Sequence, residues 1–159
     1  MDSKINYDYD TIHSLIKTGS QQIINSNFKP DLILAIGGGG FIPARILRNY
    51  LDIPIITTTI NYYDQNNQIQ DTPNIVQMID QNMIKNKNVL IVDEIDDTRK
   101  TIDYLINYFK NNNYQFNSLG IFVVNNKMKN KVSPIPHDVF YFSCCENPDV
   151  WINYPWDLI

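Results

Sequence analysis

Four carboxylates lie within five residues of one segment, directly after an apolar run and before a stretch with helical character. Neighbouring acids can hold sugar hydroxyls or a divalent cation. The first turn of a helix offers unpaired backbone N–H groups and a partial positive charge, which suit a phosphate. The segment therefore predicts a phosphate site beside acids that hold either sugar hydroxyls or a divalent cation. Its acids and hydroxyls are Asp93, Glu94, Asp96, Asp97, Thr98 and Thr101.

Helix capping is the simplest alternative for these acids. Asp97 is well placed to be the N-cap residue of the following helix. One cap needs only one acid, however, and several carboxylates around one turn repel one another unless a cation or ligand offsets their charge. We therefore favour a binding site over a cap.

A run of four glycines, Gly37 to Gly40, follows another apolar run. A dinucleotide-binding fingerprint would need glycine at position 42, where Ile42 stands, and no Gly-Lys-Ser/Thr follows as in a nucleoside triphosphate loop. A tight turn between a strand and a helix needs only one or two glycines. The run predicts a backbone that approaches an anion closely, at Gly37, Gly38 and Gly39.

Two tryptophans and a tyrosine occupy the last nine residues, at Trp151, Tyr154 and Trp156. Packing of large side chains is one explanation. The other is a platform on which a flat heterocycle stacks against Trp151 while the backbone of Ile152 contacts its edge. Both explanations stay open at this point.

The elements that must position these residues alternate between strands and helices. We expect strands over 31–36, 54–60, 88–93, 119–124 and 139–142, helices over 7–26, 41–51, 73–83 and 98–110, and a mobile polar loop over 61–72. This order predicts an α/β fold with a mainly parallel twisted sheet of about five strands flanked by helices, in a single domain over 1–159. Ligands bind beyond the carboxyl ends of such strands, so the glycine run and the acidic segment should share one edge.

Composition narrows the class of protein. The net charge of −4 argues against a protein that coats nucleic acid or an anionic membrane. No apolar run approaches the ~20 residues that span a bilayer, and the first residues lack a secretory signal. Adjacent Cys144 and Cys145 offer no disulfide framework or zinc cluster. We expect a cytoplasmic protein that acts on small molecules, with neither a membrane nor a nucleic-acid partner.

Three motifs resemble those of one family, the type I phosphoribosyltransferases. Residues 89–101 resemble its signature for phosphoribosyl pyrophosphate (PRPP), in which an apolar strand and two acids precede Asp-Thr-Gly-x-Thr. Arg99 replaces the usual glycine, as in a similar Asp-Asp-Thr-Arg form of fungal hypoxanthine-guanine phosphoribosyltransferases. Gly37 to Gly40 resemble the family's pyrophosphate loop, and residues 151–157 resemble the Trp-Ile-x-x-Pro-Trp-Asp tail of bacterial xanthine-guanine phosphoribosyltransferases.

The resemblance implies a purine-salvage pentosyltransferase with a small C-terminal hood over the purine. A 6-oxopurine (hypoxanthine, guanine or xanthine) and PRPP would give the nucleoside 5′-monophosphate and pyrophosphate. Asp97 would take the proton from N7 of the purine. Asp93 and Glu94 would hold ribose hydroxyls and Mg²⁺, and Asp157 would hold a second Mg²⁺ through water. The ribose-phosphate site would be completed by Asp96, Thr98, Arg99, Lys100 and Thr101.

The resemblance also implies purine contacts. Trp151 would stack on the base, the backbone of Ile152 would contact its edge, and Lys127 or Lys129 would donate to the 6-oxo oxygen. Asn153 stands where the bacterial enzymes have an acid, so the preferred 6-oxopurine stays open.

Other implications concern the pyrophosphate loop, closure and assembly. Gly38 stands where bacterial enzymes carry a basic residue, and Arg99 and Lys100 are candidates to replace that cation. Tyr63, in the polar loop, would close over the reacting centre. A homodimer or homotetramer is expected. The alternative function is a regulator of the same fold that binds nucleotides or RNA with little catalysis.

Overall fold

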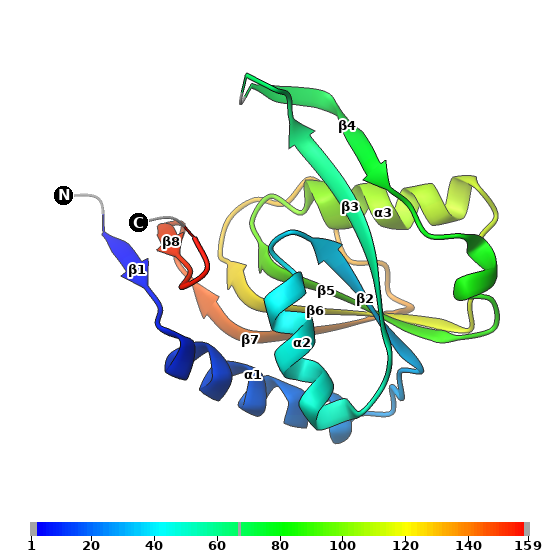
Figure 1. Cartoon of the computed structure of the whole chain (residues 1–159), viewed down its shortest axis with the longest axis horizontal. Coiled ribbons are helices and arrows are strands. Elements are labelled where there is room, and N and C mark those ends of the chain that lie inside the picture. Colours follow the sequence, from blue (N-terminus) through cyan, green and yellow to red (C-terminus); the bar gives the residue numbers. More distant parts are fainter. Residues whose placement is uncertain (1–2, 67, 158–159) are drawn as a thin grey trace.

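A six-stranded sheet forms the centre of the molecule in the computed structural model, which describes residues 3–66 and 68–157 (Figure 1). The strand order is β4-β3-β2-β5-β6-β7, and all neighbours are parallel except β3 and β4. A second sheet pairs β1 with β8. The elements are β1 (Lys4–Asn6), α1 (Tyr9–Ile24), β2 (Leu32–Gly37), α2 (Phe41–Leu51), β3 (Ile55–Tyr63), β4 (Ile69–Gln77), the 3-10 helix η1 (Gln81–Met83), β5 (Asn88–Asp96), α3 (Lys100–Asn111), β6 (Ser118–Lys127), β7 (Val139–Asn147) and β8 (Trp151–Asn153).

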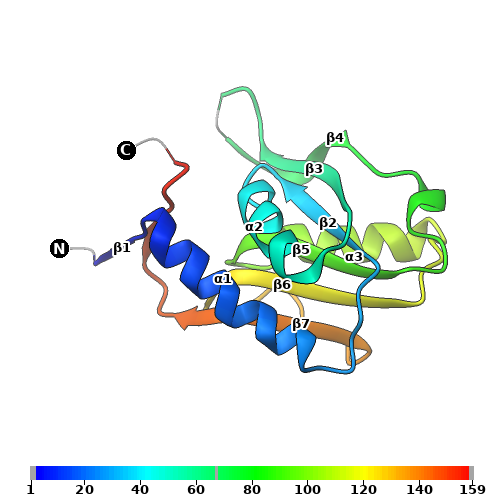
Figure 2. The same cartoon turned by 60° about the horizontal axis from the view of Figure 1, so that its bottom comes forward.

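Helices cover both faces of the sheet, with α1 and α2 on one face and α3 on the other (Figure 2). Successive residues of a strand point to opposite faces, so β2 places Ile33 and Ala35 in the core under α1 and α2. Leu34 and Ile36 pack in the other core, under α3. Because the inner strands are buried on both faces, their sequences are continuous apolar runs. The expected α/β fold is confirmed.

The carboxyl ends of β2 and β5 lie side by side. The two strands are parallel neighbours, with Ala35 opposite Val92. The glycine run after β2 and the acidic segment at the end of β5 therefore meet at one edge, as the strand order requires.

The expected helix over 73–83 and the expected loop over 61–72 are both wrong. Residues 69–77 form β4, which pairs antiparallel with β3 at the edge of the sheet, and only the short η1 is helical. Pairing with β3 overrides a weak local preference. An edge position also accommodates Pro73, because an edge strand has one side without ladder hydrogen bonds.

The two-stranded sheet was not expected from the sequence. Lys4, Ile5 and Asn6 pair in parallel with Trp151, Ile152 and Asn153, so segments from the two ends of the chain lie side by side (Figure 1). The strand count of about five is corrected to six in the main sheet. In the described part of the chain, no helix is long and apolar enough to cross a membrane.

Candidate active site

A pocket of about 290 Å³ opens at the carboxyl edge of β5. One wall comes from the β3–β4 hairpin, and the other runs from the end of β5 into the first turn of α3. The lining residues are Tyr62, Tyr63, Ile69, Asp93, Glu94, Ile95, Asp97, Thr98, Arg99, Lys100, Thr101 and Ile102. Tyr63 thus lies beside the site, although on a strand rather than in a loop.

The acidic pair Asp93 and Glu94 forms the inner end of this pocket. Asp93 is buried, and its Oδ1 accepts a hydrogen bond from the Glu94 backbone N–H at 2.9 Å. Burial, and then the neighbouring charge of Glu94, raise the pKa of Asp93 well above its usual value. Among the described residues no lysine or arginine forms an ion pair with either carboxylate. Both acids are therefore available to a cation or to hydroxyl groups.

The glycine run packs directly against this acidic pair. A Cβ atom on Gly39 would collide with the carboxylate of Glu94, and one on Gly40 would collide with backbone oxygens of Val92 and Ile36. The Gly37–Gly38 peptide bond is cis. Two segments more than fifty residues apart in the sequence thus form one site.

The loop between β5 and α3 presents free backbone donors to the pocket. Within the described residues, none of the N–H groups from Thr98 to Thr101 donates a hydrogen bond. The N-cap residue of α3 is Arg99, without a side-chain cap, so the alternative that Asp97 caps the helix is wrong. Free N–H groups at the start of a helix suit a phosphate.

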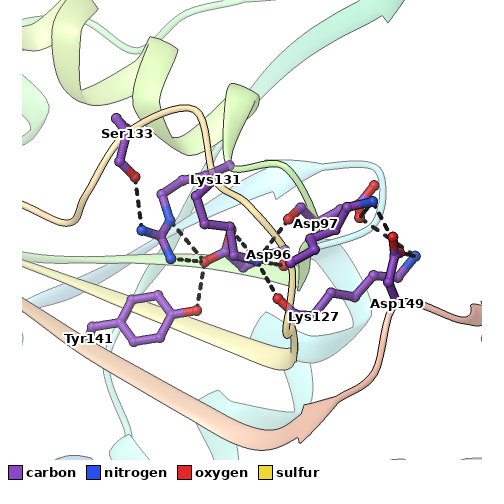
Figure 3. Close-up of polar contacts among 9 residues, drawn as sticks. Asp96, Asp97, Lys127, Lys131, Ser133, Tyr141 and Asp149 are labelled. Atoms are coloured by element: carbon purple, nitrogen blue, oxygen red, sulfur yellow. Dashed lines mark hydrogen bonds and ion pairs between the residues drawn. The ribbon is translucent and has the colours of Figure 1, made fainter.

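Asp96 is turned away from the pocket, which corrects its expected role as a ligand of PRPP. Its side chain is fully buried, and Figure 3 shows it among its polar partners, the Tyr141 hydroxyl included. Its Oδ2 accepts hydrogen bonds from Arg99 Nε at 3.0 Å, Arg99 Nη2 at 2.7 Å and the Tyr141 hydroxyl at 2.7 Å. The Asp96 carboxylate therefore supports the loop between β5 and α3 from its buried side.

Arg99 is held by the same contacts. Its Nη1 donates to the Ser133 carbonyl at 3.0 Å, and its guanidinium lies 5.6 Å from the centre of the Tyr141 ring. The guanidinium therefore does not serve the glycine run, which corrects the idea that it replaces the cation missing at Gly38. Lys100 is exposed.

Two lysines and two aspartates form a charged group at the other end of the loop (Figure 3). Lys129 Nζ lies 3.1 Å from Asp97 Oδ1 and 3.0 Å from Asp149 Oδ1. Lys127 Nζ lies 3.6 Å from each of the same two atoms. Both candidate purine lysines thus contact the candidate base, Asp97.

The C-terminal segment presents Trp151 to solvent, with 64% of the residue exposed, while Ile152 is buried. Trp151 Nε1 donates to Asn153 Oδ1 at 2.7 Å, and Asn153 Nδ2 donates to Asn6 Oδ1 at 2.7 Å. The exposed ring leaves a free face for stacking, and β1 fixes the side chain of Asn153.

Asp157 does not join the acidic pair. Its Oδ2 accepts from the Tyr154 backbone N–H at 3.1 Å. Over residues 3–66 and 68–157, no three His, Cys, Asp or Glu side chains form a group that could hold a metal. Asp157 thus lies apart from Asp93 and Glu94, and its expected role at a second Mg²⁺, through water, stays a prediction, as does the role of the acidic pair at the first.

Comparison with known proteins places this geometry in a family. The family model for the phosphoribosyl transferase domain matches residues 8–158. The chain belongs to the phosphoribosyltransferase family. The hypoxanthine-guanine phosphoribosyltransferase of Schizosaccharomyces pombe is 36% identical over 97% of this chain and 89% of its own length. Xanthine phosphoribosyltransferase 1 of Saccharomyces cerevisiae is 32% identical over 94% of this chain and 87% of its own length.

Solved structures of related proteins share the fold. Purine phosphoribosyltransferase from Pyrococcus horikoshii is 28% identical, with a TM-score of 0.73, over 100% of this chain and 96% of that one. A hypothetical protein from Neisseria gonorrhoeae, solved with bound ppGpp, is 43% identical with a TM-score of 0.90 and covers 100% of this chain and 92% of that one.

Sequence reasoning missed several residues of this phosphoribosyltransferase site. They support the loop or the charged group from other elements and are Lys131, Ser133, Tyr141 and Asp149. A lysine near the end of an inner strand is a weak signal for Lys131. No local pattern marks the other three.

Proposed function

We propose that this phosphoribosyltransferase transfers the ribose 5-phosphate group of PRPP to N9 of a 6-oxopurine and releases pyrophosphate. One observation carries the proposal. Among the described residues, the pocket joins two carboxylates that form no ion pair, Asp93 and Glu94, to N–H groups over residues 98–101 that donate no hydrogen bond, and Glu94 packs on Gly39. This pairing suits a sugar that bears phosphate groups at both ends.

The loop and the acidic pair would bind different parts of PRPP. The N–H groups and the hydroxyls of Thr98 and Thr101 hold the 5′-phosphate. Asp93 and Glu94, which form no ion pair among the described residues, would hold the ribose hydroxyls and a Mg²⁺. When bound, that ion would supply positive charge to offset the charge of the pyrophosphate. The backbone at Gly37 to Gly39, of which Gly39 lies against Glu94, would receive the pyrophosphate.

Asp97 is the candidate general base. It lines the pocket at the end nearest the charged group. A carboxylate there accepts the N7 proton as N9 bonds to the sugar carbon and the bond from that carbon to the pyrophosphate oxygen breaks. Lys127 or Lys129 then donates to the 6-oxo oxygen, and Trp151 stacks on the base.

The decisive experiment measures pyrophosphate release from PRPP and Mg²⁺ with hypoxanthine, guanine, xanthine or adenine offered separately. We expect release with one or more 6-oxopurines and none with adenine. The absence of pyrophosphate release with all four bases would contradict the proposal. The same assay identifies the 6-oxopurine that Asn153 leaves open.

Substitution of Asp97 tests its role as the base. Asp97→Asn should lower kcat by about 100-fold or more, because general base catalysis contributes at least that much. Its KM for PRPP should change little. Asp138→Asn, at an exposed position, is the matched control. An equal loss in binding and turnover would make Asp97 a binding residue.

Binding of the guanine nucleotide ppGpp is a second candidate function. The related Neisseria protein carries ppGpp in its structure. A purine with phosphates on its ribose presents the same groups as the proposed substrates, so it would compete with PRPP. Inhibition that rising PRPP relieves is expected, and inhibition insensitive to PRPP would contradict a shared site.

The assembly follows the family resemblance. We propose that residues 1–159 form one phosphoribosyltransferase domain that acts as a homodimer or homotetramer in the cytoplasm. Light scattering of the purified chain measures the oligomeric state.

A further inference from the structure

The phosphate loop, residues 96–99, accepts a hydrogen bond at each of its four backbone carbonyls. Lys131 Nζ donates to the carbonyls of Asp96 at 2.6 Å and Asp97 at 2.8 Å. The Val132 N–H donates to the Thr98 carbonyl at 3.0 Å. The Arg99 carbonyl accepts from within α3, from the N–H of Asp103 at 2.9 Å.

Three of these carbonyls are held by one short segment, Lys131 to Ser133, which we call the strap. The strap also holds side chains, because the Ser133 carbonyl accepts from Arg99 and the Ser133 hydroxyl donates to Asp103 Oδ1 at 2.6 Å. No residue of the strap lines the pocket. Carbonyls bonded to the strap cannot rotate toward a bound phosphate, which leaves N–H groups on the pocket side.

Lys131 also makes a third bond, to the backbone carbonyl of Lys127 at 2.7 Å (Figure 3). Lys127 belongs to the charged group, in which its ammonium contacts Asp97. One ammonium group therefore ties the phosphate loop to the end of β6, where Lys127, one of the two candidate purine lysines, is located. Only 13% of the Lys131 side chain is exposed, and burial lowers the pKa of its ammonium group.

We propose that Lys131 is a positioning residue that couples the 5′-phosphate loop to the purine subsite. The inference rests on the proposed function, since it assigns these two subsites to one nucleotide. The ladder between β5 and β6 reaches only to Asp96 and Asn126. An ammonium with its three donors directed at three carbonyls therefore fixes the backbone where the two strands end. Loss of the ammonium frees the peptide group that follows Asp97, just beyond the ladder, to rotate.

Binding measurements on Lys131→Met test this role. Methionine keeps most of the length of the side chain but removes the three donors. Lys110→Met is the matched control, because Lys110 is exposed and makes no side-chain hydrogen bond within the described residues. Ribose 5-phosphate probes the phosphate loop alone, whereas inosine 5′-monophosphate contacts both subsites.

We expect titration calorimetry to show about tenfold weaker binding of ribose 5-phosphate to Lys131→Met, in line with the usual cost of losing charged hydrogen bonds. Binding of inosine 5′-monophosphate should weaken further, because the spacing of the two subsites is also lost. Lys110→Met should bind both as the wild type does.

Several results would overturn the inference. Lys131→Met that binds both ligands like the wild type, or that only melts at a lower temperature, would show a purely structural lysine. Equal losses for the two ligands would show support of the phosphate loop without coupling. If Lys131→Met does not fold, Lys131→Gln takes its place in the same titrations. Wild-type protein that binds both ligands but releases no pyrophosphate would contradict the proposed function alone.

Discussion

At the scale of the residue, Arg99 shows how a position that favours glycine accepts a side chain. Its φ of 70° lies in the left-handed region, which costs a residue other than glycine about 1–2 kcal/mol. Its guanidinium forms an ion pair with the buried Asp96 carboxylate and packs on the ring of Tyr141. It also donates a hydrogen bond to the Ser133 carbonyl. The departure from the family signature at Arg99 is therefore a supporting contact of the loop.

Two substitutions separate the backbone and side-chain terms at Arg99. Arg99→Ala should lower the free energy of unfolding by about 3 kcal/mol, because the buried Asp96 carboxylate loses both guanidinium hydrogen bonds and keeps only the Tyr141 hydroxyl at 2.7 Å and the Lys131 ammonium at 3.6 Å. Arg99→Gly should lose about 1–2 kcal/mol less, since glycine adopts positive φ without strain. Denaturant unfolding measures both variants. Equal losses would mean that the backbone at this position is not strained.

Asp93 makes stability depend on pH. Burial raises the pKa of Asp93 above its usual 3.8, so the folded state binds more protons than the unfolded state. The free energy of unfolding should therefore fall as pH rises from about 3.8 through the raised pKa. Asp93→Asn should remove this decline, be more stable at pH 7, and bind Mg²⁺ and PRPP less tightly. Asp10→Asn, at an exposed position, serves as the control. A decline that persists in Asp93→Asn would assign it to another group.

At the scale of the element, the site depends on close contact between the loops after β2 and at the end of β5. That contact leaves no room for a side chain at Gly39, whereas a Cβ on Gly38 meets nothing within 4 Å. The two neighbouring glycines thus have different roles. One allows two loops to touch, and the other leaves an open backbone beside the acidic pair.

Alanine at each glycine tests this difference. Gly39→Ala should lower the free energy of unfolding by about 1–3 kcal/mol, the usual cost of overpacking. It should also weaken PRPP binding, because Glu94 must move. Gly38→Ala should melt like the wild type. Thermal melts measure both, and equal destabilisation would contradict the packing of Gly39 on Glu94.

At the scale of the whole molecule, a segment near each end of the chain belongs to one small sheet, which adjoins the end of β5. β1 pairs with β8, and the Tyr7 N–H donates to the Asn153 carbonyl at 3.0 Å. The Tyr154 hydroxyl donates to Asn125 Oδ1 at 2.7 Å and lies 3.2 Å from the Glu94 carbonyl. Residues from both ends of the chain thus hold the segment that carries Trp151 next to the acidic pair.

Disruption of the small sheet should therefore affect one substrate more than the other. Ile5 pairs with Ile152 and packs against the core. Ile5→Asp should raise the KM for the purine several-fold and change the KM for PRPP little, because the acidic pair and the phosphate loop lie on the main sheet. Lys4→Ala, at an exposed position, is the control. Equal changes in both KM values would contradict a separate purine end.

Local sequence patterns predict many features of this fold. Continuous apolar runs predict the inner strands because those strands are buried on both faces, as the residues from Leu32 to Ile36 show. The acids at 93–97 and the glycines at 37–40 stand out because their chemistry is local. The edge hairpin escaped prediction, since β4 forms by pairing with β3 and has few buried residues of its own.

The sequence by itself determined the α/β order of elements, the two loops that meet at one sheet edge, and the residue types of the candidate PRPP site. Only the tertiary structure decided where each acid lies. Asp93, Glu94 and Asp97 line the pocket, whereas Asp96 turns inward to Arg99 and Tyr141. It also revealed the strap at Lys131 and the pairing of β1 with β8. The physical reason is the distance along the sequence over which each feature is determined. Burial patterns and turn chemistry depend on neighbouring residues, whereas a buried charge is satisfied by partners that are far away in the sequence.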